Sequence, residues 1–163
     1  MKIESILCPV DFSDHSREAV EYAVEFARVS KSTLYLVHVV PAFEYAGYLD
    51  EYLPLPTDEF YEELVKQSEE ELRKLSENAA GVEVRTMVRR GTPYAEIVAF
   101  AREAKADLIV LSSHGRSGIR EFFFGSTAEK VLRKAHCPVL IIPPGWIQAP
   151  RGGSSCGRAS TPG

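Results

Sequence analysis

The sequence is poor in cysteine and contains no long apolar run. Its three cysteines, Cys8, Cys137 and Cys156, lie far apart and none forms a Cys-x-x-Cys pair, so neither a disulfide framework nor a zinc site is indicated. We expect Cys8 and Cys137 to be small buried hydrophobic residues. No stretch of about 18 apolar residues occurs, and the first residues lack the apolar segment of a signal peptide. The sequence therefore predicts a cytoplasmic protein with no membrane partner.

Familiar motifs of nucleotide-dependent enzymes and hydrolases are also missing. Neither Gly-x-x-x-x-Gly-Lys-Ser/Thr nor Gly-x-Gly-x-x-Gly occurs, which argues against P-loop enzymes and dinucleotide oxidoreductases. Asp11, His114 and either Ser113 or Ser126 match the residue types of a Ser/His/Asp triad. However, no Gly-x-Ser-x-Gly elbow presents a nucleophile, and no His/Asp/Glu cluster with metal-ligand spacing is visible. We predict no catalytic residue and no metal site formed by the protein alone.

The chain has no excess of positive charge. Its 163 residues carry a formal charge of −4, whereas a nucleic-acid reader usually presents a basic face, so nucleic acid is not expected as a partner. Residues 143–163 hold two arginines, no acidic residue and nine glycines or prolines, which leaves −6 for residues 1–142. Such a segment buries too little apolar surface to offset its ordering entropy. We predict one domain at 1–142 and a flexible C-terminal tail at 143–163, which could also be left over from cloning.

Apolar segments and helical patterns alternate along the first 142 residues. Continuous apolar or β-branched runs predict buried strands at 3–10, 33–40, 106–113 and 138–142, with an alternating edge strand at 82–88. Apolar residues three to four apart predict helices at about 14–29, 58–79, 93–105 and 126–136. Ser126 and Glu129 form an expected capping box for the last helix, and the Glu-rich second helix is expected to have a solvated face. This alternation predicts an α/β fold, a doubly wound three-layer sandwich with a five-stranded parallel sheet.

Three segments are expected to meet at the carboxyl ends of the strands, where ligands bind in doubly wound sheets. They are Pro9–Asp11, His38–Val39 and Ser112–Thr127. The last contains three glycines and leads into a helix N-terminus, whose free N–H groups and positive dipole favour phosphate. The simpler alternatives are that these glycines only end a strand and begin a helix, that Asp11 is a turn or N-cap residue, and that His38 is a hydrogen-bonded core residue.

Three motifs carry a resemblance to a known family. Ile-Leu-Cys-Pro-Val-Asp-Phe-Ser at 6–13, Val-His-Val at 37–39 and Ser-Ser-His-Gly-Arg-Ser-Gly…Phe-Gly-Ser-Thr at 112–127 are similar to the universal stress protein family, and the resemblance covers residues 2–142. In its ATP-binding branch the last motif reads Gly-x-x-Gly, nine residues, then Gly-Ser or Gly-Thr. Here the spacing is kept, but Ser112 replaces the first glycine, and its side chain could crowd the ribose or hydrogen-bond to it. The resemblance implies an adenine nucleotide alpha hydrolase-like fold.

The resemblance also implies a set of nucleotide-binding residues. Contacts to adenine or ribose would come from Pro9, Val10, Asp11, Val39 and Ser112. Contacts to the phosphates would come from Gly115, Arg116, Gly125, Ser126 and Thr127. The implied ligand is ATP, with Mg²⁺ or Mn²⁺ carried by its phosphates. The implied partner is a second copy of the chain, giving a homodimer through the last strand at Pro138–Ile142.

Three functions are open from the sequence. The leading prediction is a cytoplasmic universal stress protein that binds ATP or another adenine nucleotide as a sensor or switch in the stress response. A slow ATPase or nucleotide hydrolase would use the same loop with Arg116 and Asp11, although no general base other than Asp11 stands out. A nucleotide-free dimeric interaction protein is the third, motivated by Ser112 and by the aromatic loop at 43–61.

Overall fold

The computed structural model describes residues 2–42, 57–113 and 125–145. Predictions for the segments at 43–56, 114–124 and 146–163 lie outside the described residues. Strands and helices alternate along the chain: β1 (Ser5–Pro9), α1 (Asp14–Ser30), β2 (Thr33–Pro41), α2 (Asp58–Glu77), β3 (Val84–Gly91), α3 (Pro93–Glu103), β4 (Leu108–Ser112), α4 (Ser126–Lys134) and β5 (Val139–Ile142).

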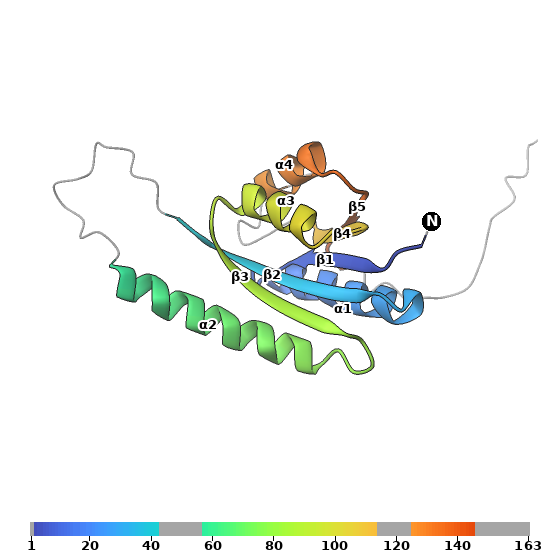
Figure 1. Cartoon of the computed structure of the whole chain (residues 1–163), viewed down its shortest axis with the longest axis horizontal. Helices are drawn as coiled ribbons and strands as arrows, with labels where there is room; N and C mark the ends of the chain where they lie inside the picture. The colour runs from blue at the N-terminus through green and yellow to red at the C-terminus, as the bar shows by residue number, and fades with distance from the viewer. Residues whose placement is uncertain (1, 43–56, 114–124, 146–163) are drawn as a thin grey trace, which may run out of the picture.

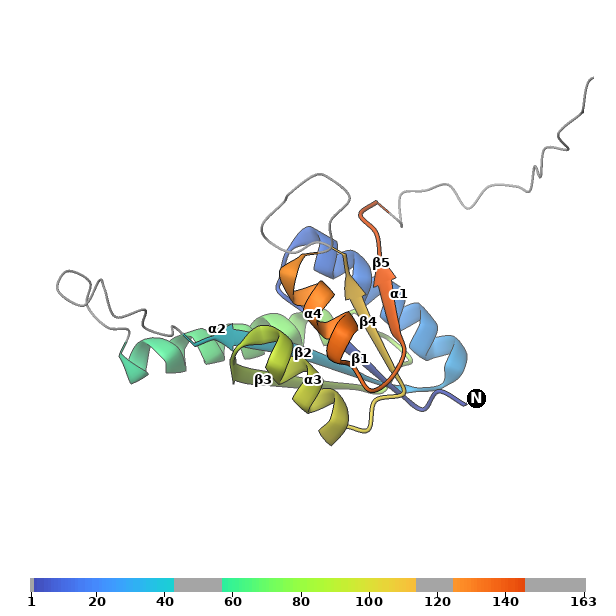
Figure 2. The same cartoon turned by 90° about the horizontal axis from the view of Figure 1, so that it is seen from above.

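Within the described residues, five parallel strands form one sheet in the order β3-β2-β1-β4-β5 (Figure 2). Leu7 in the central strand β1 pairs with Tyr35 of β2 on one side and with Ile109 of β4 on the other. The chain winds outward from β1 to β3, returns, and then winds the other way through β4 to β5, which confirms the doubly wound sheet. β3 lies at one edge, as predicted, and β5 lies at the other.

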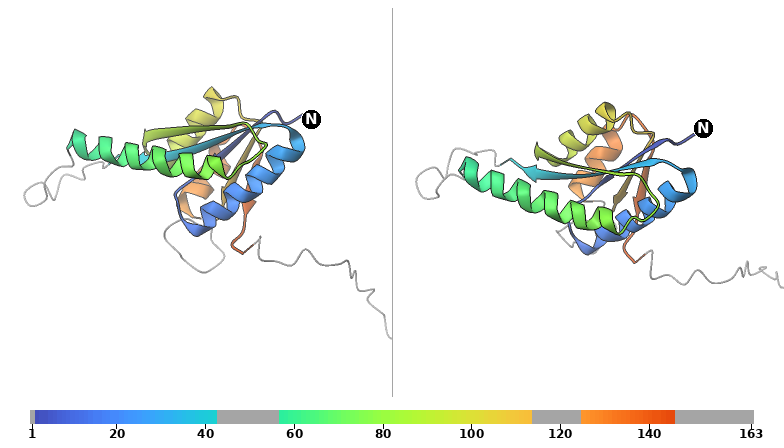
Figure 3. Two further views of the ribbon diagram at one scale, coloured as in Figure 1. Left: turned by 90° about the horizontal axis from the view of Figure 1, so that it is seen from below. Right: turned by 60° about the horizontal axis from the view of Figure 1, so that its bottom comes forward.

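Helices cover both faces of this sheet (Figure 1). α1 and α2 lie on one face, and α3 and α4 lie on the other (Figure 3). Because side chains alternate along a strand, Ile6 and Cys8 pack against α1, whereas Leu7 and Val37 pack toward α3 and α4. All four side chains are fully buried. Burial on both faces explains why the central strands are almost continuously apolar, and the three-layer sandwich is confirmed.

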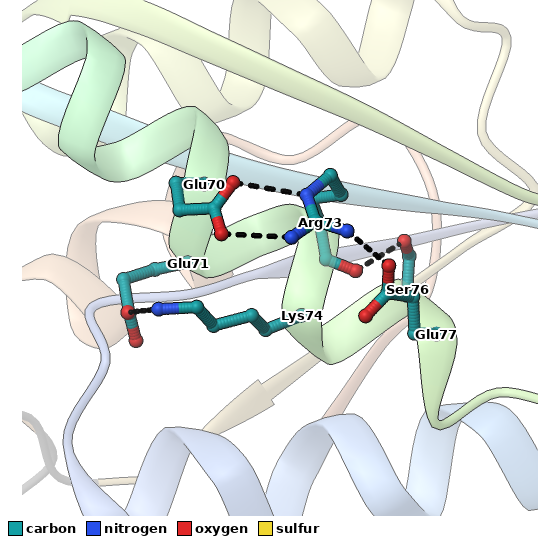
Figure 4. Close-up of polar contacts among 6 residues, drawn as sticks. All are labelled: Glu70, Glu71, Arg73, Lys74, Ser76 and Glu77. Atoms are coloured by element: carbon teal, nitrogen blue, oxygen red, sulfur yellow. Dashed lines mark hydrogen bonds and ion pairs between the residues drawn. The ribbon is translucent and has the colours of Figure 1, made fainter.

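The long helix α2 buries a narrow stripe and exposes a charged face. Its buried residues are Tyr61, Ser68 and Leu72. On the exposed face Arg73 pairs with both Glu70 and Glu77 (Figure 4). Exposed pairs of this kind add little stability, and the predicted solvated face is confirmed. None of the described helices is long and apolar enough to cross a bilayer.

The start of α4 differs from the sequence-based expectation. Gly125 is the N-cap residue and Ser126 is the first helical residue, so the predicted capping box between Ser126 and Glu129 is wrong. Gly125 has non-helical backbone angles (φ −54°, ψ 148°), and its N–H donates to the Ser113 carbonyl oxygen over 2.9 Å. This bond joins the residues on either side of the 114–124 segment, and it fixes the helix start one residue earlier than the serine signal indicates.

Strand β3 ends later than its sequence pattern indicates. It runs to Gly91, whose carbonyl oxygen accepts a hydrogen bond from the residue that follows β2. The alternating pattern predicted a strand only to residue 88. Arg89 and Arg90 continue the strand, and their guanidinium groups lie over aromatic rings, 5.6 Å from the Phe100 centroid and 3.5 Å from the Tyr61 centroid. The other strands begin and end within two residues of the predicted positions.

The two cysteines among the described residues are free thiols. Cys8 is fully buried in the core beside α1, which confirms the prediction for this residue. Cys137 is only partly buried and packs at the border of the core on the α3 and α4 face. Burial raises the pKa of both thiols, and that of Cys8 reaches about 12. Neither is therefore a reactive thiolate near neutral pH.

Candidate functional site

A cavity of about 360 Å³ lies at the carboxyl ends of β1, β2 and β4, beside the point where the strand order reverses. Eight of the ten predicted site residues line it: Pro9, Val10, Asp11, Val39, Ser112, Gly125, Ser126 and Thr127. The other two, Gly115 and Arg116, lie outside the described residues. His38, which was predicted to lie at this end of the sheet, also lines the cavity, as do Pro93 and Ile97, which were not predicted. No local signal marks the last two, because they reach the cavity only through the packing of α3 across the sheet.

The end of β2 presents backbone groups toward the cavity. Val10 donates its N–H to the Val37 carbonyl oxygen over 2.8 Å, one residue past the end of β1. The hydrogen-bonding groups of a strand alternate between its two neighbours, so the N–H and C=O of Val39 point to the same side as those of Val37. β1 ends at Pro9, and Val39 therefore has no strand residue opposite it there. A donor and an acceptor side by side can form two hydrogen bonds to the edge of a base.

Another wall of the cavity is the N-terminus of α4. Ser126, Thr127 and Ala128 form its first turn, and all three line the cavity. The first intrahelical bond runs from the Glu129 N–H to the Gly125 carbonyl oxygen over 3.0 Å, so the earlier N–H groups have no partner within the helix. Free N–H groups and the positive end of the helix dipole make this turn suited to an anion.

Asp11 follows β1 and lines the cavity. Its Oδ1 accepts hydrogen bonds from the N–H and the hydroxyl of Ser13, over 3.0 and 2.6 Å, which confirms the interpretation of Asp11 as a turn residue. Ser13 is in turn the N-cap of α1, where its hydroxyl oxygen accepts from the N–H of Ser16. A carboxylate has about four acceptor sites, so Asp11 can hold this turn and still accept a bond from a ligand hydroxyl.

His38 is partly buried and lines the cavity from β2. Its Nδ1 lies 2.7 Å from the Val10 carbonyl oxygen, and its ring centroid lies 4.4 Å from that of Phe12. These contacts confirm the expected hydrogen-bonded histidine. Its place on the cavity wall agrees with the expectation that His38–Val39 lies at the carboxyl ends of the strands.

Ser112 is the last residue of β4, lines the cavity and is partly exposed. Among the described residues, no group of three or more His, Cys, Asp and Glu side chains is placed to hold a metal ion. The cavity thus offers backbone groups for a ring, a carboxylate for a hydroxyl and a helix N-terminus for a phosphate. This arrangement suits a small anionic ligand that carries a hydrogen-bonding ring.

The chain matches the model of the universal stress protein family over residues 2–143. Universal stress protein MJ0531 of Methanocaldococcus jannaschii is 37% identical over 145 residues, which covers 85% of this chain and 81% of that protein. Universal stress protein YxiE of Bacillus subtilis is 34% identical over 148 residues, which covers 84% of this chain and 97% of that protein. The solved structure of MJ0577, from M. jannaschii, has a TM-score of 0.76 at 26% identity, covering 88% of this chain and 97% of that one. A universal stress protein from Archaeoglobus fulgidus, solved in complex with dAMP, has a TM-score of 0.60 at 28% identity, covering 87% and 99%.

Proposed function

Because the chain belongs to the universal stress protein family, we propose that it binds ATP or another adenine nucleotide in this cavity, as a cytoplasmic sensor or switch of the stress response. The observation that carries the proposal is that the end of β2 and the first turn of α4 line one cavity. Its volume of about 360 Å³ falls in the range of small-ligand sites. The dAMP complex of the A. fulgidus relative supports this class of ligand.

The proposed nucleotide has its base on the sheet side and its phosphates at α4. Adenine would lie against the apolar side chain of Val39, on the α3 and α4 side of the sheet, and bond to the Val39 backbone. The ribose hydroxyls would reach Asp11 and Ser112. The phosphates would accept from the N–H groups that begin with Ser126, and they would carry Mg²⁺ or Mn²⁺ themselves. The net charge of −4 means that this local donor set, rather than the overall field, attracts the phosphates.

Isothermal titration of the full chain with Mg-ATP, AMP and Mg-GTP tests the proposal. We expect saturable binding of both adenine nucleotides, and tighter binding of ATP because its additional phosphates reach α4. GTP is expected to bind at least about tenfold more weakly, because guanine reverses the donor and acceptor that would meet the Val39 backbone, and unpaired buried groups are costly. No saturable heat from either adenine nucleotide at about millimolar concentration would contradict the proposal.

A second candidate function, slow ATP hydrolysis, is favoured by one observation. Asp11 is the acidic side chain on the described cavity wall and could orient a water molecule. Phosphate release measured on the titrated samples distinguishes the two functions, and comparison with Asp11→Asn shows whether this carboxylate is required. ATP that stays intact for hours favours a binding protein.

We also propose that two copies of the chain pair through β5. This strand lies at an edge of the sheet, and Val139, Leu140 and Ile141 are only partly buried. The carbonyl oxygen of Pro138 accepts from the N–H of Ile109 in β4, and that of Ile142 accepts from Ser113, the residue after β4. Because these groups alternate along the strand, the N–H and C=O of Val139 and Ile141 point away from β4 and are available to a second strand.

Ile141→Pro is expected to convert the dimer to a monomer, because proline removes an outward donor without touching the bonds to β4. Light scattering coupled to gel filtration measures the molecular mass. Thr86→Pro is the matched control, since Thr86 is an outward position on β3, the opposite edge of the sheet, and should leave the dimer intact. A wild-type protein that is monomeric at working concentration would contradict the proposed pairing.

A further inference from the structure

The turn between β1 and α1 contains a residue in an unfavourable conformation. Phe12 has φ 64°, the left-handed region in which the Cβ of a bulky residue is crowded. Such a conformation persists only where the surrounding contacts hold it, and it tends to occur at functional sites. Val10 and Asp11, which precede Phe12, both line the proposed nucleotide cavity. The contacts that hold this turn are therefore also contacts that shape the cavity.

The turn is held from both ends. Within the turn, Ser13 donates two hydrogen bonds to Asp11 Oδ1. From outside, His38 on β2 makes two contacts at once. Its Nδ1 is 2.7 Å from the Val10 carbonyl oxygen, and its ring lies beside the Phe12 ring with 4.4 Å between centroids and 32° between planes. His38 thus connects the second strand to the residues on either side of Asp11.

The chemistry of the His38 bond fixes a peptide plane. A carbonyl oxygen only accepts, so Nδ1 carries a hydrogen in this contact. The Val10 C=O and the Asp11 N–H belong to one planar trans peptide and point in opposite directions. His38 projects to the face opposite that of Val37 and Val39, which pack toward α3 and α4. Holding the Val10 carbonyl at His38 therefore directs the Asp11 N–H toward the α3 and α4 side, where the cavity lies.

We infer that His38 is a positioning residue of the nucleotide site, which keeps the strained turn in the conformation that presents Asp11 to the ligand. This inference rests on the proposed function. Without the contact, the turn would relax from the left-handed conformation of Phe12 for part of the time. The apparent affinity is the intrinsic affinity multiplied by the fraction of molecules whose turn is in the binding conformation. If only one molecule in ten has that conformation, binding is about tenfold weaker.

Three replacements of His38 separate its two contacts. His38→Asn keeps a nitrogen donor at the same number of bonds from the backbone, His38→Phe keeps a ring beside Phe12 without the donor, and His38→Leu removes both. Titration with Mg-ATP is expected to show about three- to tenfold weaker binding for His38→Phe and His38→Leu, and binding within about twofold of wild type for His38→Asn. Leu34→Ala, a fully buried residue on the same face of β2 at its other end, controls for lost stability and should keep the wild-type affinity.

A double-mutant cycle tests whether His38 acts through the turn. Phe12→Asn places a residue that tolerates the left-handed conformation, so the turn needs less support. If His38 acts by holding the turn in the left-handed conformation at Phe12, then His38→Leu weakens binding less in the Phe12→Asn background than in the wild type, and the effects are not additive. Wild-type affinity in His38→Leu and His38→Phe, with normal ATP binding by the wild type, would overturn this inference alone. No ATP binding by the wild type would overturn the proposed function as well.

Discussion

Ser126→Glu is expected to weaken ATP binding at least about tenfold while leaving the free energy of unfolding unchanged or higher. Ser126 is the exposed first residue of α4 and lines the cavity. A carboxylate there complements the helix dipole and adds about 0.3–1 kcal/mol of stability. The same charge repels the phosphates, by roughly 3 kcal/mol for unit charges about 5 Å apart at an effective dielectric constant of about 20. Even about half of that repulsion corresponds to a tenfold loss of affinity.

Two controls separate charge from shape. Ser126→Gln has nearly the same size as Ser126→Glu without the charge, and its ATP affinity should stay within about threefold of wild type. Adenosine has no phosphate, so it should bind Ser126→Glu and the wild type equally. Titration calorimetry gives the affinities and urea unfolding gives the stabilities. Equal ATP binding by Ser126→Glu and wild type would mean that the phosphates do not lie at the start of α4.

The order of the elements was predictable because each one carries a local pattern. Strand β1, with Ile6, Leu7 and Cys8 buried on alternating faces, is almost continuously apolar, and parallel strands require such burial. The end of β3 was not predictable, because the alternation of apolar and charged residues stops where the two charged residues Arg89 and Arg90 follow each other. Only the tertiary structure supplies the aromatic rings of Phe100 and Tyr61, over which the two guanidinium groups lie.

The location of the cavity was predictable from topology alone, since doubly wound sheets bind ligands where the strand order reverses. Its details depend on contacts between distant residues. The start of α4 is set by the bond from Gly125 to Ser113, which overrides the local cap signal of Ser126. The left-handed Phe12 and its contact with His38 likewise have no local sequence signal. The roles of the cavity residues in binding stay predictions, as do the positions of Gly115 and Arg116.

Raising the pH from 7 to 10 is expected to destabilise the wild-type protein by about 1.4 kcal/mol more than Cys8→Ala, and by roughly twice that at pH 11. Cys8 is fully buried, and desolvation raises its pKa from 9.0 to about 12. In the unfolded chain the thiol ionises near pH 9, whereas in the folded protein it stays protonated. The contribution of Cys8 to stability is therefore complete below about pH 9 and is lost as the pH rises toward 12.

Urea unfolding of both proteins at pH 7, 10 and 11 measures this difference. At pH 7, Cys8→Ala should be less stable by roughly 1 kcal/mol, because the sulfur leaves a small cavity. This gap should close near pH 10, and Cys8→Ala should be the more stable protein by pH 11. Partial burial also raises the pKa of Cys137. This residue is present in both proteins, so its contribution cancels in the difference between their stabilities. A gap that stays constant to pH 11 would mean that Cys8 ionises in the folded state. Water would then reach the core between β1 and α1, where Cys8 packs.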